Sequence, residues 1–343
     1  MRRRRAVQAL AATGALGLLP WSTSRAESTG AASVDALPPL EGELTLYLGR
    51  GEGGLYEKVL QAIEQRNPKL KLGIRRGPTA ALANAIIAEG KAGVLRADVF
   101  WAVDSGAIGL VSDAGLGQEL PDDLVGQLQG EFQYPNFVPV TGRIRTLPYH
   151  STTVLPAKIP KHIMDIPDAG LSLGWAPAYA SFQSFVTAMR ILEGDSATAD
   201  WLRAVKPLAK SYAGELGVVL GAARGEVDVG FANHYYTLRL KAGKPDARVD
   251  LAFTHNDAGC LVNASCAMPL GEGDLPINFI RYLMTQEVQS YLAREAYEIP
   301  LVKGVAPPQG LPALDTIDPP NVNLIQLADL RPTLELMRNV GIL

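Results

Sequence analysis

Two adjacent tyrosines, Tyr235 and Tyr236, are the side chains whose type and spacing point most directly to chemistry. They follow residues 225–232, a valine-rich alternating stretch that predicts a buried strand. If a helix begins near Thr237, both phenol groups can converge on one point, whereas a continuing strand would turn them to opposite faces. Ligands of open α/β sheets bind beyond the carboxyl ends of strands. The pair therefore predicts a metal or anion site, against the commoner alternative of amphipathic packing with wet hydroxyls.

A third tyrosine, Tyr179, occupies a comparable position. The stretch 171–175 predicts a strand and 182–192 a helix, with Ser181 as the expected N-cap residue. Tyr179 thus lies just past the end of one strand and just before a helix, as Tyr235 and Tyr236 do. Three phenols in equivalent topological positions are more than packing alone predicts.

Two arginines, Arg143 and Arg145, are spaced two apart on a predicted strand at 141–150, so they share one face of it. They could form a solvated face. They could also direct a guanidinium group into a cleft, where its planar set of donors suits an oxyanion.

The glycine-rich turn at 49–54 contains Arg50 and follows the first predicted strand. Its spacing matches neither G-x-G-x-x-G nor a P-loop, which excludes a dinucleotide site of those kinds. A nest of backbone amides that approaches some other anion is still compatible with a glycine loop entering a helix.

Motifs for enzymatic chemistry are missing from the sequence. The four histidines show no HExxH spacing, no G-x-S-x-G element occurs, and the two cysteines, Cys260 and Cys266, form no CxxC pair. We expect both cysteines to be free and buried, because on one straight strand they would lie too far apart for a disulfide. His234 is expected to pack beside the tyrosines or support them. The net charge of −3 gives no electrostatic case for a nucleic-acid partner.

The elements that must position these residues alternate between strand and helix, which predicts a mostly parallel sheet with helices on its faces. The series restarts after Arg143 and returns after His255, so we expect two α/β lobes with crossovers near residues 140 and 262. The expected strands are 43–48, 70–74, 97–101, 141–150, 171–175, 249–254 and 260–269; the expected helices are 55–66, 80–90, 105–114, 182–192, 199–208, 215–224, 274–293 and 329–339.

The first residues predict export. Four arginines at 2–5, an apolar stretch at 6–21 and Ser24-Arg25-Ala26 form the three regions of a signal peptide, with cleavage expected near Ala26. The adjacent arginines resemble a twin-arginine export signal. An uncleaved anchor is the alternative. The mature protein is therefore expected to be extracytoplasmic, that is, periplasmic.

The chain resembles the bacterial periplasmic ferric-ion-binding proteins, the substrate-binding components of Fe(III) ABC importers. The resemblance covers nearly all of the mature chain and is carried by segments 46–52, 97–101, 141–143, 175–183, 224–230, 233–236 and 298–302. It implies a two-lobed, transferrin-like periplasmic binding protein fold of class II type, each lobe a mixed sheet flanked by helices. The implied division is a signal peptide at 1–26, a flexible leader at 27–40, an N-terminal lobe at 41–141 plus about 262–315, and a C-terminal lobe at 142–261 plus about 316–343.

The resemblance also implies the ligands. The family's paired tyrosines fall on Tyr235 and Tyr236, and the third tyrosine of its tyrosine-rich members falls on Tyr179. A histidine used by other members is replaced by Gly51, and a glutamate by Val103. These two departures favour a site whose protein ligands come mainly from tyrosine.

Further residues are implied around the ligands. Arg143 matches the anion-binding arginine and Asn233 an asparagine beside the site. Ser181, Arg50 and Asp104 are further candidates for binding the anion or supporting the ligands.

The resemblance implies that the protein is no enzyme but captures Fe(III), with carbonate as the candidate synergistic anion, and delivers it to an ABC permease. A monomer is expected. Fe(III) is a hard cation that anionic oxygen suits, and an adjacent metal ion can force a phenol to ionise. The alternative is a binder of an organic or oxyanionic solute, such as a polyamine, sugar or phosphonate, in the same fold.

Overall fold

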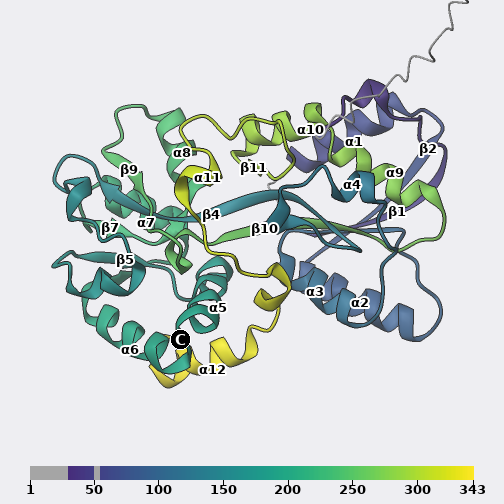
Figure 1. Ribbon diagram of the computed structural model, residues 1–343. Coiled ribbons are helices and arrows are strands. Elements are labelled where there is room, and N and C mark those ends of the chain that lie inside the picture. The colour runs from purple at the N-terminus through teal and green to yellow at the C-terminus, as the bar shows by residue number, and fades with distance from the viewer. Residues whose placement is uncertain (1–29, 50–54) are drawn as a thin grey trace, which may run out of the picture.

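The computed structural model describes residues 30–49 and 55–343. The predicted signal peptide, Arg50 and Gly51 lie outside this described part. Two α/β halves lie side by side and are joined through the middle of the molecule by β4 (Val138–His150) and β10 (Val262–Pro269) (Figure 1). This arrangement confirms the predicted two-lobed architecture.

The first half is built on three parallel strands. β1 (Gly42–Gly49) pairs with β2 (Leu70–Gly77) on one side and β3 (Val99–Ala102) on the other. All four residues of β3 are buried, as expected for a strand covered on both faces. The surrounding helices are α1 (Leu55–Arg66), α2 (Thr79–Lys91), α3 (Ser105–Asp113), the short α4 (Asp122–Val125), α9 (Asp274–Leu283) and α10 (Gln286–Tyr291).

The second half repeats the pattern around an aromatic core. The short parallel strands β5 (Leu173–Trp175), β6 (Ala209–Ser211) and β7 (Val229–Gly230) carry α5 (Ala180–Glu193), α6 (Asp195–Val205), α7 (Glu215–Ala223) and α8 (His234–Gly243). Phe182, Phe185, Trp201 and Phe231 contact one another with ring centroids 5.4–6.3 Å apart. Aromatic clusters of this kind bury large apolar areas and fix the positions of the helices that carry them.

β4 is long enough to belong to both halves. Its first part pairs antiparallel with β10 and with β11 (Ile299–Pro300), and its second part with β8 (Ala232–Asn233) and β9 (Val249–Ala252). The two crossing strands therefore place Arg143 and Arg145 midway between the halves, where any site shared by the lobes must lie.

The end of the chain touches both halves. η8 (Leu324–Leu327) packs against α3, and α12 (Arg331–Asn339) packs against α5 and α6. The close approach of η8 depends on small residues in α3, since a Cβ atom on Gly106 would lie 2.9 Å from the Cα atom of Ala328. Residues 316–343, assigned from the sequence to the C-terminal lobe, therefore also contact the first half. The exact lobe boundaries stay a prediction.

Several boundaries differ from those expected. α8 begins at His234, three residues before the predicted start. α5 begins at Ala180, with Tyr179 rather than Ser181 in the N-cap position, because the Tyr179 carbonyl accepts from the Phe182 and Gln183 amides, 3.0 and 3.2 Å away. The predicted helix at 274–293 is broken at Met284 and Thr285, where the Thr285 side chain caps α10.

The predicted flexible leader also differs where it is described. Residues 30–40 lie on the body of the protein, where Ser33 bonds Glu287 and the buried Leu40 donates its amide to Asn67. Cys260 and Cys266 are both free and buried, as expected. Within residues 30–49 and 55–343, no helix is both long and apolar enough to cross a membrane.

Candidate functional site

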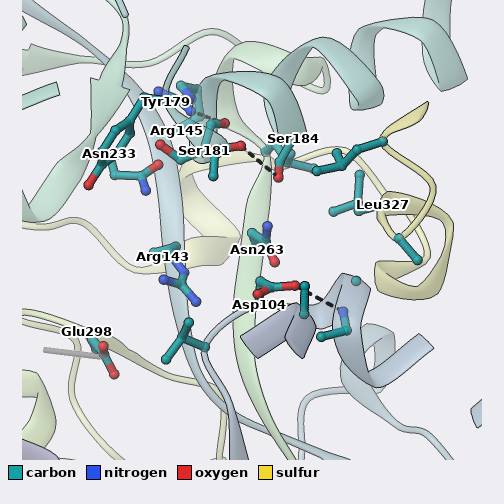
Figure 2. A pocket seen from close by; sticks show the side chains of 18 of the residues that line it. Asp104, Arg143, Arg145, Tyr179, Ser181, Ser184, Asn233, Asn263, Glu298 and Leu327 are labelled. Carbon is teal, nitrogen blue, oxygen red and sulfur yellow. Dashed lines mark hydrogen bonds between the residues drawn. The ribbon is translucent and has the colours of Figure 1, made fainter. Parts of the chain in front are cut away.

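A cavity of about 550 Å³ lies between the two halves. Residues from distant parts of the chain line it, among them Tyr179, Tyr235, Tyr236, Arg143 and Asn233. In Figure 2, Tyr179, Ser181 and Asn233 lie on one side of Arg143, while Asp104 and Glu298 lie on the other. The fold thus brings to one place all three tyrosines that the sequence singled out.

The three phenols form a contiguous group. The Tyr179 and Tyr236 hydroxyl oxygens are 2.7 Å apart, and the Asn233 side-chain amide donates to the Tyr235 hydroxyl at 3.3 Å. The rings of Tyr235 and Tyr236 lie 4.5 Å apart between centroids. Although adjacent in sequence, both side chains face the cavity, because the chain turns from strand to helix at His234.

Two helix N-termini meet at this group. Asn233 is the N-cap residue of α8 and Tyr179 that of α5, and neither side chain caps its own helix. Helix N-termini carry unpaired amides and partial positive charge, which favour a nearby anion. The position therefore suits ionised phenolates or a bound oxyanion.

Without a cation, however, the surroundings oppose ionisation of Tyr236. Burial raises the pKa of this phenol above its ordinary value near 10, and the neighbouring Tyr235 and Tyr179 raise it further. Tyr236 is consequently neutral at pH 7 in the metal-free protein. Ionising it requires a strong positive charge within ligand distance, such as a multivalent metal ion.

Arg143 supplies a fixed positive charge opposite the phenols. Its Nη2 atom is buried and has no hydrogen-bond partner among the described residues. Burial alone would lower the pKa of Arg143, but Tyr235, Glu298, Tyr56 and Asp104 outweigh it and raise the pKa. A charged guanidinium with a spare buried donor can bind an oxyanion, because leaving that donor unpaired costs free energy.

Asp104 and Val103 line the cavity on the side of the first half. One oxygen of Asp104 caps α3 by accepting from the Ala107 amide at 3.0 Å. Val103 offers no donor atom. The described part of the first half therefore presents two carboxylates to the cavity, those of Asp104 and of the buried Glu298.

Glu298 was not anticipated from the sequence as a cavity residue. Its carboxylate accepts from the Tyr56 hydroxyl at 2.8 and 3.1 Å and from the Thr141 hydroxyl. Its 5% exposure places it deep in the wall. Nothing in the local sequence signals this role, since Tyr56 and Glu298 are separated by 242 positions.

Arg145 and Glu215 form a buried ion pair beside the cavity, with side chains 2% and 0% exposed and a 2.5 Å contact. The sequence placed Arg145 on one face with Arg143, but gave no indication of its partner. The two arginines therefore differ in kind: Arg145 is neutralised by a carboxylate, while Arg143 retains an unpartnered donor.

His234 is a structural residue, as expected. Its Nδ1 accepts from the Ile144 amide at 3.2 Å and its Nε2 donates to the Tyr297 carbonyl at 2.6 Å. Burial, the largest influence, lowers its pKa to about 4. The imidazole is neutral at pH 7 with both nitrogens engaged. No group of three or more His, Cys, Asp or Glu side chains in the described residues could hold a metal ion.

No family model matches the chain. It is 29% identical over 285 residues to the Fe(3+)-binding periplasmic protein of Serratia marcescens, covering 80% of this chain and 83% of the relative. It is 25% identical over 326 residues to the major ferric iron-binding protein of Neisseria meningitidis, covering 91% and 96%. Iron-bound HitA from Pseudomonas aeruginosa superposes with a TM-score of 0.75 at 26% identity, covering 89% of this chain and all of HitA. These homologues are named as binding proteins rather than enzymes, and the fold is the two-lobed periplasmic binding protein fold.

Proposed function

We propose that this chain, a homologue of the periplasmic ferric-ion-binding proteins, captures Fe(III) in its interlobe cavity and delivers it to an ABC permease. The observation that carries the proposal is the convergence of Tyr179, Tyr235 and Tyr236 in one cavity that also contains the unpartnered Nη2 atom of Arg143. Among solutes, a trivalent hard cation with an accompanying oxyanion uses all of these groups.

The charges match this cargo. Three phenolates carry three negative charges, which neutralise Fe(III), and anionic oxygen is the donor that a hard cation prefers. The raised pKa of Tyr236 means that phenol ionisation is coupled to metal binding, so capture releases protons. Arg143 would hold the synergistic anion, for which carbonate is the leading candidate, with Asn233 and Ser181 beside it.

Most protein ligands come from the second half in this proposal. Tyr179, Tyr235 and Tyr236 all lie there, while the described part of the first half lines the cavity with Asp104 and with Tyr56 and Glu298, which are hydrogen-bonded to each other. Closure of the lobes would then mainly exclude water from the ion, and opening would release it to the permease. We expect a monomer that compacts on loading, with lobe boundaries near 141/142 and 261/262, and scattering with and without Fe(III) measures this compaction.

The proposal includes export to the periplasm, with cleavage near Ala26 and passage through the twin-arginine route. Mass spectrometry of the mature protein should therefore find residues 1–26 removed, and an intact Met1 would contradict cleavage. Replacing the arginines at 2–5 with lysine should block export if the route is the twin-arginine one.

The deciding experiment is metal analysis together with a visible spectrum of protein purified from its own host. We expect close to one iron per chain and a phenolate-to-iron charge-transfer band that disappears on chelation. A colourless protein without iron, which also gains no band when Fe(III) and bicarbonate are added, would contradict the proposal. An organic or oxyanionic solute found in its place would establish the alternative function.

A further inference from the structure

One buried carboxylate, that of Glu215, holds both segments that carry the phenols. Its Oε1 atom accepts from Arg145 at 2.5 Å and from the Ser181 hydroxyl, and its Oε2 atom accepts from the Asn233 backbone amide at 2.9 Å. Ser181 lies two residues after Tyr179, and Asn233 lies two residues before Tyr235. Two chain segments more than fifty residues apart are thus bonded to the same side chain.

Arg145 completes this connection from β4. Its Nη2 atom donates to the carbonyl of Ser181, a residue that Figure 2 shows beside Arg145, while its Nη1 atom bonds Glu215. β4 also pairs Arg145 with Asn233 across the strand ladder. The Glu215–Arg145 ion pair therefore fixes the starts of α5 and α8 relative to β4.

Glu215 does not act as a ligand itself. Its side chain is fully buried and its oxygens already accept three hydrogen bonds. It stands behind Arg145, Ser181 and Asn233, which do line the cavity. Buried ion pairs are expensive to desolvate and are often neutral for stability compared with apolar packing, so a role in fixing geometry is a natural reason for this one.

We propose that the Glu215–Arg145 pair is a positioning device that sets the separation between the Tyr179 phenol and the Tyr235–Tyr236 pair. The inference rests on the proposed function, because the phenols are taken as Fe(III) ligands. Metal sites are sensitive to the groups that orient their ligands, and loss of such a group commonly costs 10–100-fold in metal affinity. Here one carboxylate orients both ligand-bearing segments.

The test replaces Glu215 by glutamine, which keeps the size of the side chain and removes its charge. We expect Glu215→Gln to weaken Fe(III) binding about 10–100-fold in competition with citrate and to shift the phenolate-to-iron band, because the phenols lose their common reference. A shift of the band distinguishes altered ligand geometry from a general loss of stability. Glu215→Gln that binds Fe(III) as tightly as the parent, with an unchanged band, would overturn the inference.

Asp257→Asn is the matched control. Asp257 is also a fully buried carboxylate in the second half, and it accepts from the Ile163 and Gly259 amides at 2.6 and 2.7 Å, away from the tyrosines. Its replacement should lower the unfolding temperature without moving the band. An equal band shift in Asp257→Asn would overturn the inference, because it would attribute the effect to loss of stability in this lobe.

Two further arms keep the test decisive. If Glu215→Gln does not fold, Ser181→Ala removes one bond to Glu215 but keeps the ion pair; a smaller band shift supports the inference and an unchanged band overturns it. If the parent binds no Fe(III), the proposed function fails, and the near-ultraviolet circular dichroism of the tyrosines in the metal-free protein becomes the readout. There, Glu215→Gln should change the tyrosine signals of that spectrum relative to Asp257→Asn, and identical spectra would overturn the positioning role.

Discussion

The two walls of the cavity differ in the side chains that line them. The phenol wall, made of Tyr179, Tyr235 and Tyr236 at the starts of α5 and α8, concentrates ionisable oxygens at two helix N-termini. The opposite wall, made of Val103, Asp104 and Leu110 with Leu327 of η8, is mostly apolar and offers one carboxylate that already caps α3. Arg143 lies between them on β4.

This difference separates binding from enclosure. If the three tyrosines are the ligands, as proposed, they are already assembled on one half, so a cation could bind there before the lobes close. The opposite wall then removes water and strengthens the electrostatic interactions inside the cavity. Under the proposed function, the phenol wall determines most of the affinity for Fe(III), and the opposite wall determines access to the ion.

The largest expected effect comes from the phenol wall. Tyr236→Phe and Tyr235→Phe each keep the ring and remove the ligating oxygen, so we expect roughly thousandfold weaker Fe(III) binding, about 4 kcal/mol, with a shifted charge-transfer band. Competition titration against citrate measures the affinity. Tyr149→Phe is the control, since Tyr149 is buried on β4 away from the lining residues. Parent-like binding and spectrum in both variants would rule out the phenol wall as the binding wall.

His234 begins α8 and bonds both Ile144 and Tyr297, and its burial should make the folded protein sensitive to acid. Its folded pKa of about 4 is lower than the ordinary 6.5, so the unfolded chain binds the proton more readily between these values. The stability that comes from burying neutral His234 is complete above pH 6.5 and is lost as the pH falls to 4, a loss of about 3 kcal/mol. Urea unfolding at pH 4 and pH 7 measures it.

The variant His234→Gln cannot be protonated in this range, so the loss of stability assigned to His234 should be absent from it. If the unfolding free energies of the parent and His234→Gln fall equally between pH 7 and pH 4, another group causes the acid sensitivity. Such a result would mean that protonation of His234, which bonds Ile144 and Tyr297, does not contribute measurably to the pH dependence of the unfolding free energy.

The third prediction concerns Arg143, which lies between the two walls. Arg143→Ala should reduce Fe(III) affinity about 10–100-fold and make it insensitive to bicarbonate, because the unpartnered guanidinium that holds the anion is gone. Titrations with and without added bicarbonate measure this dependence. Arg143→Lys keeps the charge but loses the planar set of donors, so it should retain part of the dependence. Full bicarbonate dependence in Arg143→Ala would place the anion elsewhere.

The smallest expected effect is a gain on the opposite wall. Val103→Glu adds a second carboxylate to the opposite wall, beside that of Asp104. We expect roughly tenfold tighter Fe(III) binding, about 1.4 kcal/mol. Val103→Gln is the matched control, because it has nearly the same size without the charge. Equal affinities in the two variants would show that the opposite wall does not reach the ion when the lobes close.

The phenol wall could be predicted from the sequence because its signals are local. Strand periodicity and helix spacing around Tyr179 and Tyr235 place each tyrosine just past a strand, and the topology of α/β sheets then brings such positions together. The same local reasoning misplaced the start of α5. Ser181 has the residue type of an N-cap, but its hydroxyl bonds Glu215, and the helix begins one residue earlier than Ser181.

Groups that act through distant partners could not be predicted. Glu215 and Arg145 are 70 positions apart, and Glu298 and Tyr56 are 242 apart, so no spacing rule links them. The packing of η8 on α3 likewise depends on Gly106 and Gly109, which in the sequence are indistinguishable from ordinary helix glycines. Long-range pairs of this kind are decided by packing rather than by local propensity.

The contacts made by the end of the chain restrict how far the two halves can move apart. η8 contacts α3 and also α5, α12 contacts α5 and α6, and only residues 328–330 link η8 to α12. From Leu327 to Arg331 a fully extended chain reaches roughly 14 Å. While these contacts hold, residues 328–330, which run beside the cavity, restrict how far the two halves can separate at this edge.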